Sequence, residues 1–232
     1  MPEPTMVATA DDLHVGRIAM PAWQAAVERL ATGSADGAGE EQLLQWRAAG
    51  ILDEQSALAP DWERAIDAQA RAKVALTLVA RQYDVAFLTN LYACPEQECA
   101  VAVTVRATVG EGRRIDVVNP QAEVAWAPLP SIWPLLRRVL PPVDAMRADV
   151  AAVGESYPVE PTEAALAAAD AAPTSVFVFA VDAASGASEE VAWYVADGVL
   201  HRLHARSRDL QQVAPGDVAA GLTAAVERLL GR

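Results

Sequence analysis

Apolar positions change their spacing at residue 73, and the change divides the chain into a helical and an extended region. Before that point they recur with a helical period, which predicts helices over Pro21–Ala31, over Glu41–Ala49 and from Pro60 to about Ala72. From Lys73 onward apolar and polar residues alternate with a period of two. That period is typical of strands that bury one face. The N-terminal third is therefore predicted to be helical, and a sheet begins directly after it.

A block of strands followed by an amphipathic helix occurs twice, in residues 74–140 and again in residues 174–230. In both blocks the strands lead to an Ala-Pro pair and then to the helix. Three matched pairs are separated by the same offset of 87 residues: Pro128 and Pro215, Leu135 and Leu222, Val139 and Val226. This indicates a duplication, although a matching order of elements can also arise by chance.

Short connections between the predicted strands indicate hairpins. Pro95–Glu98 joins the strands Val85–Cys94 and Cys99–Thr108, and so short a connection cannot cross over to a parallel strand. In the second block, Asp197 and Gly198 form the dipeptide that is typical of a type I′ turn. We therefore predict an α+β fold with a mainly antiparallel sheet, built from two quasi-repeated sheet-and-helix halves with flanking helices.

No long Gly/Ser-rich or Pro-rich linker separates the two blocks, so one domain over residues 1–232 is expected. It comprises an N-terminal helical segment (1–72), a first sheet-and-helix half (73–142), and linking helices with a second half (143–232). Alanine-rich stretches predict the linking helices at Val143–Gly154 and Pro161–Ala171.

The net charge of -13 argues against nucleic-acid binding, which requires clustered lysine and arginine. The first half is the least acidic part, and it holds five arginines that we expect to be solvated: Arg106, Arg113, Arg114, Arg137 and Arg138. The sequence contains no apolar run long enough to span a membrane, and its start lacks the pattern of a secretory signal. We therefore expect a cytoplasmic protein.

Catalytic motifs are missing from the sequence. His201 and His204 are three residues apart on a predicted strand, so their side chains point to opposite faces and cannot act as a pair. Neither a G-x-S-x-G sequence nor a phosphate-binding glycine loop is present. We expect a protein that is not an enzyme, with no cofactor and no metal site.

Cys94 and Cys99 are the two cysteines, and they flank the first hairpin loop. Cross-strand geometry could bring them near disulfide distance, whereas a metal site would need two further ligands. Because a cytoplasmic location favours reduced thiols, partly buried free cysteines are the preferred interpretation and a disulfide is the alternative.

Residues 43–78 resemble a known family. The stretch from Leu43 to Asp53 (LLQWRAAGILD), the sequence Leu58-Ala-Pro60 and the later segment Arg71 to Leu78 (RAKVALTL) are similar to the EspG family of actinobacterial type VII secretion chaperones. The duplicated halves are also similar to that family, whose fold consists of two alike sheet-and-helix halves. The chain departs from the family where Ala72-Lys73 replaces an expected Arg-Pro, and where the loop Pro95–Glu98 is compact rather than extended.

The resemblance implies a non-catalytic binding protein that keeps a secretion substrate soluble, with a PE/PPE-like or WxG-like protein as client. The family holds its client with a sheet loop and helices. Of the six tryptophans, two lie beside a proline-interrupted stretch; a core position is preferred for their rings, and an exposed partner anchor is the alternative. The candidate partner-binding residues are Pro95, Glu96, Gln97, Glu98, Trp126 and Trp133.

Two alternatives to the chaperone interpretation stay open. One is an interaction or regulatory module of the same fold with an unrelated partner. The other, less favoured, is a small-ligand protein or enzyme with a pocket between the halves, which would show convergent polar groups and perturbed titrating residues.

Overall fold

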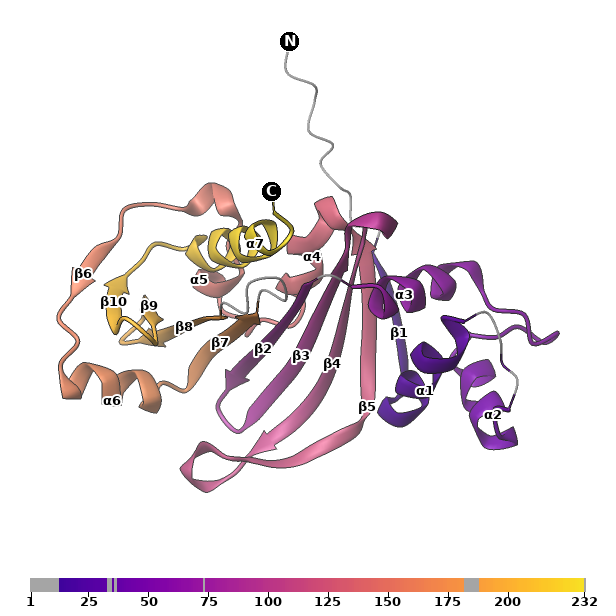
Figure 1. Ribbon diagram of the computed structural model, residues 1–232. Helices are drawn as coiled ribbons and strands as arrows, with labels where there is room; N and C mark the ends of the chain where they lie inside the picture. The colour runs from indigo at the N-terminus through magenta and orange to yellow at the C-terminus, as the bar shows by residue number, and fades with distance from the viewer. Residues whose placement is uncertain (1–12, 33–34, 36, 73, 182–187, 232) are drawn as a thin grey trace, which may run out of the picture.

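The computed structural model describes residues 13–32, 35, 37–72, 74–181 and 188–231 (Figure 1). One antiparallel sheet runs through these residues, and its ten strands lie in the order β1-β5-β4-β3-β2-β7-β8-β9-β10-β6. The predicted α+β fold with a mainly antiparallel sheet is therefore confirmed.

The first half contributes β1 (His14–Ala19), α1 (Met20–Leu30), α2 (Glu40–Ala48), α3 (Pro60–Ala70), β2 (Val74–Gln82), β3 (Val85–Cys94), β4 (Cys99–Val109), β5 (Ile115–Pro128) and α4 (Ile132–Arg137). The second contributes α5 (Asp144–Arg147), β6 (Tyr157–Val159), α6 (Glu163–Ala171), β7 (Thr174–Val181), β8 (Ser188–Ala196), β9 (Val199–His204), β10 (Asp209–Gln212) and α7 (Asp217–Leu229). Short 3-10 turns lie at Pro95–Gln97, Glu111–Arg113, Leu129–Ser131 and Val150–Ala152.

Both halves follow the same plan. Each has an edge strand (β1 or β6), a helical insertion, a meander of four strands and a closing helix (α4 or α7). The halves meet where β2 pairs with β7, with Leu78 opposite Val178. The offset of 87 residues does not hold throughout, because β5 has 14 residues and its counterpart β10 has 4.

Helices cover both faces of the sheet, as Figure 1 shows. We call the face under α4, α5 and α7 the α7 face. There, apolar residues from both halves form one core, which includes Leu76, Leu135, Val178 and Leu222. On the opposite face, α1, α2 and α3 cover the first half and α6 covers the second. No helix in the described ranges is long and apolar enough to cross a membrane.

Tryptophans fill the core under α1 to α3. The rings of Trp23 and Trp62 lie 5.7 Å apart, and those of Trp62 and Trp126 lie 4.5 Å apart. The buried indole of Trp46 donates to the carbonyl oxygen of Ala22 at 2.8 Å, so its polar atom keeps a partner. Gly16 makes room for this cluster, because a Cβ there would lie 2.3 Å from the Trp62 ring.

The expectation of a helix over Val143–Gly154 is wrong. Only α5 is α-helical, and the chain is extended at Ala148 (φ -65°, ψ 143°). Side chains impose this path: Arg147 Nε donates to the carbonyl oxygen of Leu140 at 3.0 Å, and Asp149 accepts from Trp133. The two contacts tie residues 147–149 back to α4 and to the turn that follows it, and the chain is extended between them at Ala148.

Two other local predictions are confirmed. Asp197 and Gly198 both have positive φ (50° and 78°), as a type I′ turn requires. The second linking helix exists as α6, and the Thr162 hydroxyl caps it by accepting from the amide of Ala165 at 3.1 Å.

An irregularity interrupts β5. Val105 of β4 pairs with Ala122, but Ala107 pairs with Val118, so three residues of β5 bulge opposite one of β4. Within the bulge, Asn119 Oδ1 accepts from the amide of Gln121 at 2.8 Å, and Pro120 has no amide hydrogen to donate. Pairing with β1 ends at Gln121, so residues 115–120 extend past β1 and are exposed.

Candidate functional site

The hairpin loop that the sequence singled out is fixed on both sides. Pro95–Gln97 form one 3-10 turn, and Glu98 has a left-handed conformation (φ 48°). Arg64 Nη2 on α3 donates to the carbonyl oxygen of Gln97 at 3.2 Å, and the amide of Leu129 donates to the carbonyl oxygen of Glu98 at 3.0 Å. The loop is thus a tethered turn that exposes the side chains of Glu96 and Glu98.

The two candidate tryptophans take different places. Trp133 on α4 is half-buried, and its Nε1 donates to Asp149 Oδ1 at 2.7 Å. Since α4 directly follows the turn that binds Glu98, Trp133 lies at the same end of the sheet as the hairpin. Trp126 is only 5% exposed and stacks on His14 at 5.3 Å on the opposite face. The Trp126 ring therefore lies in the core, which is the position that the sequence analysis preferred for it.

Cys94 and Cys99 are direct cross-strand neighbours, and both are buried free thiols. Burial raises the pKa of the Cys99 thiol to about 11, against the opposing effect of the nearby Arg64 guanidinium. Cys99 is therefore a neutral thiol that packs as an apolar side chain. Within the described residues, no cluster of three or more histidine, cysteine or acidic side chains is placed to hold a metal ion.

A groove of about 320 Å³ lies between α7 and the strands β7 to β9; we call it the α7 groove. Its floor is apolar and its wall is the small-residue side of α7. Ion pairs border it, with Arg202 Nη1 2.8 Å from Asp217 Oδ2 and Arg228 Nη2 2.6 Å from Glu189 Oε2. The lining includes Val178, Ala180, Val191, Trp193, Ala220 and Ala224.

The two histidines of β9 lie on opposite faces, as their spacing predicted. His204 lines the α7 groove, whereas His201 stacks on Tyr194 under α6, with ring centroids 5.0 Å apart. The two histidines cannot act as a catalytic pair, because only His204 lines the α7 groove.

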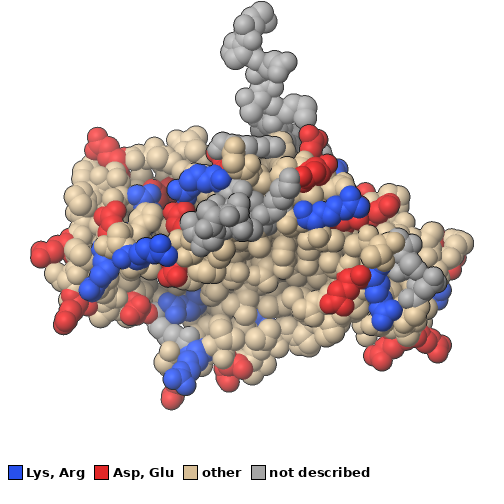
Figure 2. All heavy atoms as spheres, viewed as in Figure 1, with Lys and Arg blue, Asp and Glu red and all other residues tan. Residues whose placement is uncertain are grey.

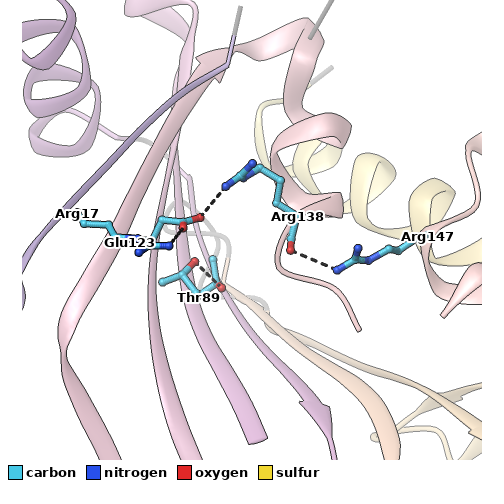
Figure 3. Close-up of polar contacts among 6 residues, drawn as sticks. Arg17, Thr89, Glu123, Arg138 and Arg147 are labelled. Atoms are coloured by element: carbon cyan, nitrogen blue, oxygen red, sulfur yellow. Dashed lines mark hydrogen bonds and ion pairs between the residues drawn. The ribbon is translucent and has the colours of Figure 1, made fainter. Parts of the chain in front are cut away.

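The first half has a corresponding groove of about 540 Å³ beside α4, the α4 groove. Figure 3 shows Glu123 between the guanidinium groups of Arg17 and Arg138. Glu123 Oε1 is 3.1 Å from Arg138 Nη2, and Glu123 Oε2 is 3.9 Å from Arg17 Nη2. Arg106 of β4 also lines this groove. The two halves therefore place grooves at corresponding positions but give them different chemistry.

A single row of cross-strand neighbours on the α7 face displays that difference. From one end of the sheet toward the other, its members are Arg17, Glu123, Thr104, Thr89, Leu78, Val178, Val191, His204 and Asp209. In the first half every member except Leu78 is charged or hydroxylic, whereas the second half has two valines beside Leu78, followed by His204 and Asp209. The two halves thus place different residues at corresponding positions of this row.

Figure 2 shows acidic and basic side chains interspersed on the face that it presents. Among the described residues visible there, no broad patch carries a single sign of charge. This face therefore lacks the continuous basic surface that nucleic acid would need.

The fold is similar to that of a type VII secretion chaperone. A structure of Mycobacterium tuberculosis EspG5 in complex with the PE25–PPE41 dimer matches with a TM-score of 0.53 and 12% sequence identity. The match covers 92% of this chain and 96% of the matched chain. No protein-family model and no curated protein sequence matches. At such low identity the likeness to EspG5 concerns the fold, and it extends over nearly the whole of both chains.

The groove residues were not predicted as a site. Arg106 and Arg138 had been noticed only as arginines of the least acidic half, and Arg17 and Glu123 carry no motif. Strand register brings Arg17 and Glu123 together, because β1 pairs with β5 across more than a hundred residues of sequence. A sequence signal for the α7 groove was the two small-residue pairs Ala220-Gly221 and Ala224-Ala225, about one helical turn apart.

Proposed function

We propose that this protein is a cytoplasmic, non-catalytic binding protein that keeps a type VII secretion substrate soluble, in the manner of an EspG chaperone. The observation that carries the proposal is the match to EspG5 over nearly the entire chain, both halves included. The matched structure contains a PE25–PPE41 dimer, and a PE/PPE-like or WxG-like protein is the client proposed for this chain.

The α7 groove is the proposed seat for an apolar helix tip of the client. Its floor of Val178, Ala180 and Val191 offers apolar contact, and the pairs of Arg202 with Asp217 and of Arg228 with Glu189 form a charged rim. An apolar centre inside a polar rim is the usual anatomy of a surface that binds an amphipathic helix.

A second contact is proposed at the hairpin end of the sheet. Pro95, Glu96, Gln97 and Glu98 form a tethered turn there, and Trp133 is half-buried on the adjacent α4. A fixed turn loses little conformational entropy when a partner binds, which favours its use as a docking point. Trp126 would contribute indirectly, by supporting the sheet beneath β1 and α3.

Co-expression with PE/PPE-like or WxG-like proteins encoded beside this gene, followed by size-exclusion chromatography, tests the proposal. We expect a stable complex in which this chain and the client elute together, and a client that precipitates when expressed alone. A client that is equally soluble without this protein, or that elutes separately, would contradict the proposed function.

A further inference from the structure

The α4 groove carries more positive than negative charge in a protein whose net charge is -13. Arg17, Arg106 and Arg138 line it, and Glu123 is the carboxylate among them. Glu123 is shared by two of these arginines, at 3.1 Å from Arg138 and 3.9 Å from Arg17. Across the described part of the chain, the Arg106 side chain makes no hydrogen bond or ion pair, and two positive charges in the groove remain unbalanced.

The sheet beneath the groove carries two buried hydroxyl groups. Thr89 and Thr104 are 1% and 7% exposed, and their oxygens lie 2.9 Å apart (Figure 3). Their mutual hydrogen bond uses one hydroxyl proton, so the other is left to donate to a different acceptor. With Thr89 as the donor of that bond the Thr104 proton stays available, and because Thr104 lines the groove, an oxygen atom seated there would find a hydroxyl donor as well as guanidinium groups.

The groove is built on fixed elements. Arg17, Glu123 and Thr104 are cross-strand neighbours on three adjacent strands, so backbone hydrogen bonds set their spacing. Arg138 follows α4, and Arg147 holds this end of the helix by donating to the carbonyl oxygen of Leu140 and to that of Arg138 (Figure 3). Strand register therefore fixes where the Arg17 side chain leaves the sheet, and the pair with Glu123 orients the Arg138 guanidinium.

We propose that the α4 groove binds the side-chain carboxylates of an acidic peptide segment in a protein partner, which deepens the proposed function and rests on it. The pair of Glu123 with Arg138 already shows that the groove suits a carboxylate, and Arg106 is available for a second one. The groove thus favours glutamate or aspartate side chains.

Isothermal titration of the full chain at low ionic strength tests this, using a short blocked peptide of alternating glutamate and alanine. The matched peptide with glutamine in place of glutamate is one control, and inorganic phosphate is a second probe. We expect the glutamate peptide to bind, with Arg106→Gln and Arg138→Gln each weakening the binding about tenfold, as loss of a charge-assisted hydrogen bond implies. Arg71→Gln, at an exposed arginine directly after α3 and outside the groove, should change it less than twofold.

Glu123→Gln is the decisive variant, because it should raise the affinity. It removes a like charge from the groove and frees Arg17 and Arg138 for the peptide, and a partly unfolded variant could not mimic a gain of binding. The proposal is overturned if the glutamine peptide binds equally well, if Glu123→Gln fails to tighten binding, or if phosphate binds more tightly than the peptide. Each result is obtained without the client, so it is distinguishable from failure of client capture.

Discussion

Trp193 and Asp217 join the second half of the sheet to its closing helix: Trp193 Nε1 donates to Asp217 Oδ1 at 2.7 Å. The other carboxylate oxygen accepts from Arg202 Nη1 at 2.8 Å. Asp217 is the first residue of α7, where a carboxylate also interacts favourably with the helix dipole. This one side chain therefore ties α7 to β8 and β9 and sets one border of the α7 groove.

Asp217→Asn should lower the free energy of unfolding by about 1–3 kcal/mol, because it removes the charge partner of the largely buried Arg202. Urea denaturation followed by tryptophan fluorescence measures the change. Asp209→Asn, on an exposed carboxylate at the start of β10, is the matched control and should stay within about 0.5 kcal/mol of the wild type. Equal effects of the two substitutions would show that the Arg202–Asp217 ion pair contributes little.

Gly221→Ala should destabilise the protein although alanine is the better helix former. A Cβ at this position would lie 2.5 Å from Cζ2 of Trp193, so the indole ring or α7 would have to move. Such overpacking costs about 1–3 kcal/mol, which exceeds the helix-propensity gain of about 1 kcal/mol.

A double-mutant cycle separates the two effects on Gly221. In a Trp193→Phe background the smaller ring leaves room for the methyl group, so the same glycine substitution should cost less than in the wild type. An increase in melting temperature for Gly221→Ala alone would mean that the ring is free to shift.

Ala224→Glu should impair client capture without affecting folding. Ala224 is exposed on α7 and lines the α7 groove, so a glutamate there would fill the proposed seat with a charged side chain. We expect at least about a tenfold loss of co-eluting client, since burying an unpaired charge at an interface costs more than 1.4 kcal/mol. Ala167→Glu, exposed on α6 over the opposite face, should leave capture unchanged. If both variants lose client capture, the loss is not specific to the α7 groove and the groove is not the binding site.

Cys99 should react slowly with iodoacetamide in the folded protein. With a pKa of about 11, only about one thiol in a thousand is ionised at pH 8, and the rate should rise roughly tenfold per pH unit toward that value. Mass spectrometry of the alkylated peptide measures it, with the protein in denaturant as the fast-reacting control. Rapid modification of native Cys99 at pH 8 would contradict its burial.

The same thiol gives stability a dependence on pH. Because its pKa is raised from 9.0 to about 11, the folded protein holds the thiol proton more tightly than the unfolded chain. Its contribution is therefore complete below about pH 8 and is lost as the pH rises from 9 toward 11. The unfolding free energy of the wild type should therefore fall relative to that of Cys99→Ala as the pH rises from 9 toward 11. A constant difference across this range would argue against the raised pKa.

The sequence predicted the elements whose pattern is local. The helices before residue 73 follow the 3.6-residue period, and the Asp197–Gly198 turn needs only its own two residues. The prediction of a helix over Val143–Gly154 was wrong because helix propensity takes no account of contacts with distant residues. Here Leu140 binds Arg147, and Trp133 binds Asp149. The three-residue strand β6 is defined by its pairing with β10 rather than by its own pattern.

The grooves could not be predicted for a related reason. Glu123 meets Arg17 only through the register between β1 and β5, and Arg138 reaches it from a separate helix. The duplicated order of elements did predict that the halves would correspond. It could not predict that Thr89 and Thr104 in the first half correspond to Val191 and His204 in the second. That correspondence depends on strand register, which decides which residues become cross-strand neighbours.

Two prolines lie where the sheet would otherwise offer its backbone to another chain. Pro120 interrupts the stretch of β5 that extends past β1, and Pro158 is the central residue of the outer strand β6. Each lacks the amide hydrogen that an added strand would need, so strand addition at these positions is blocked. A partner that approaches them must be recognised through side chains. A client bound as proposed would therefore find no backbone template for its own extended segments at these two positions.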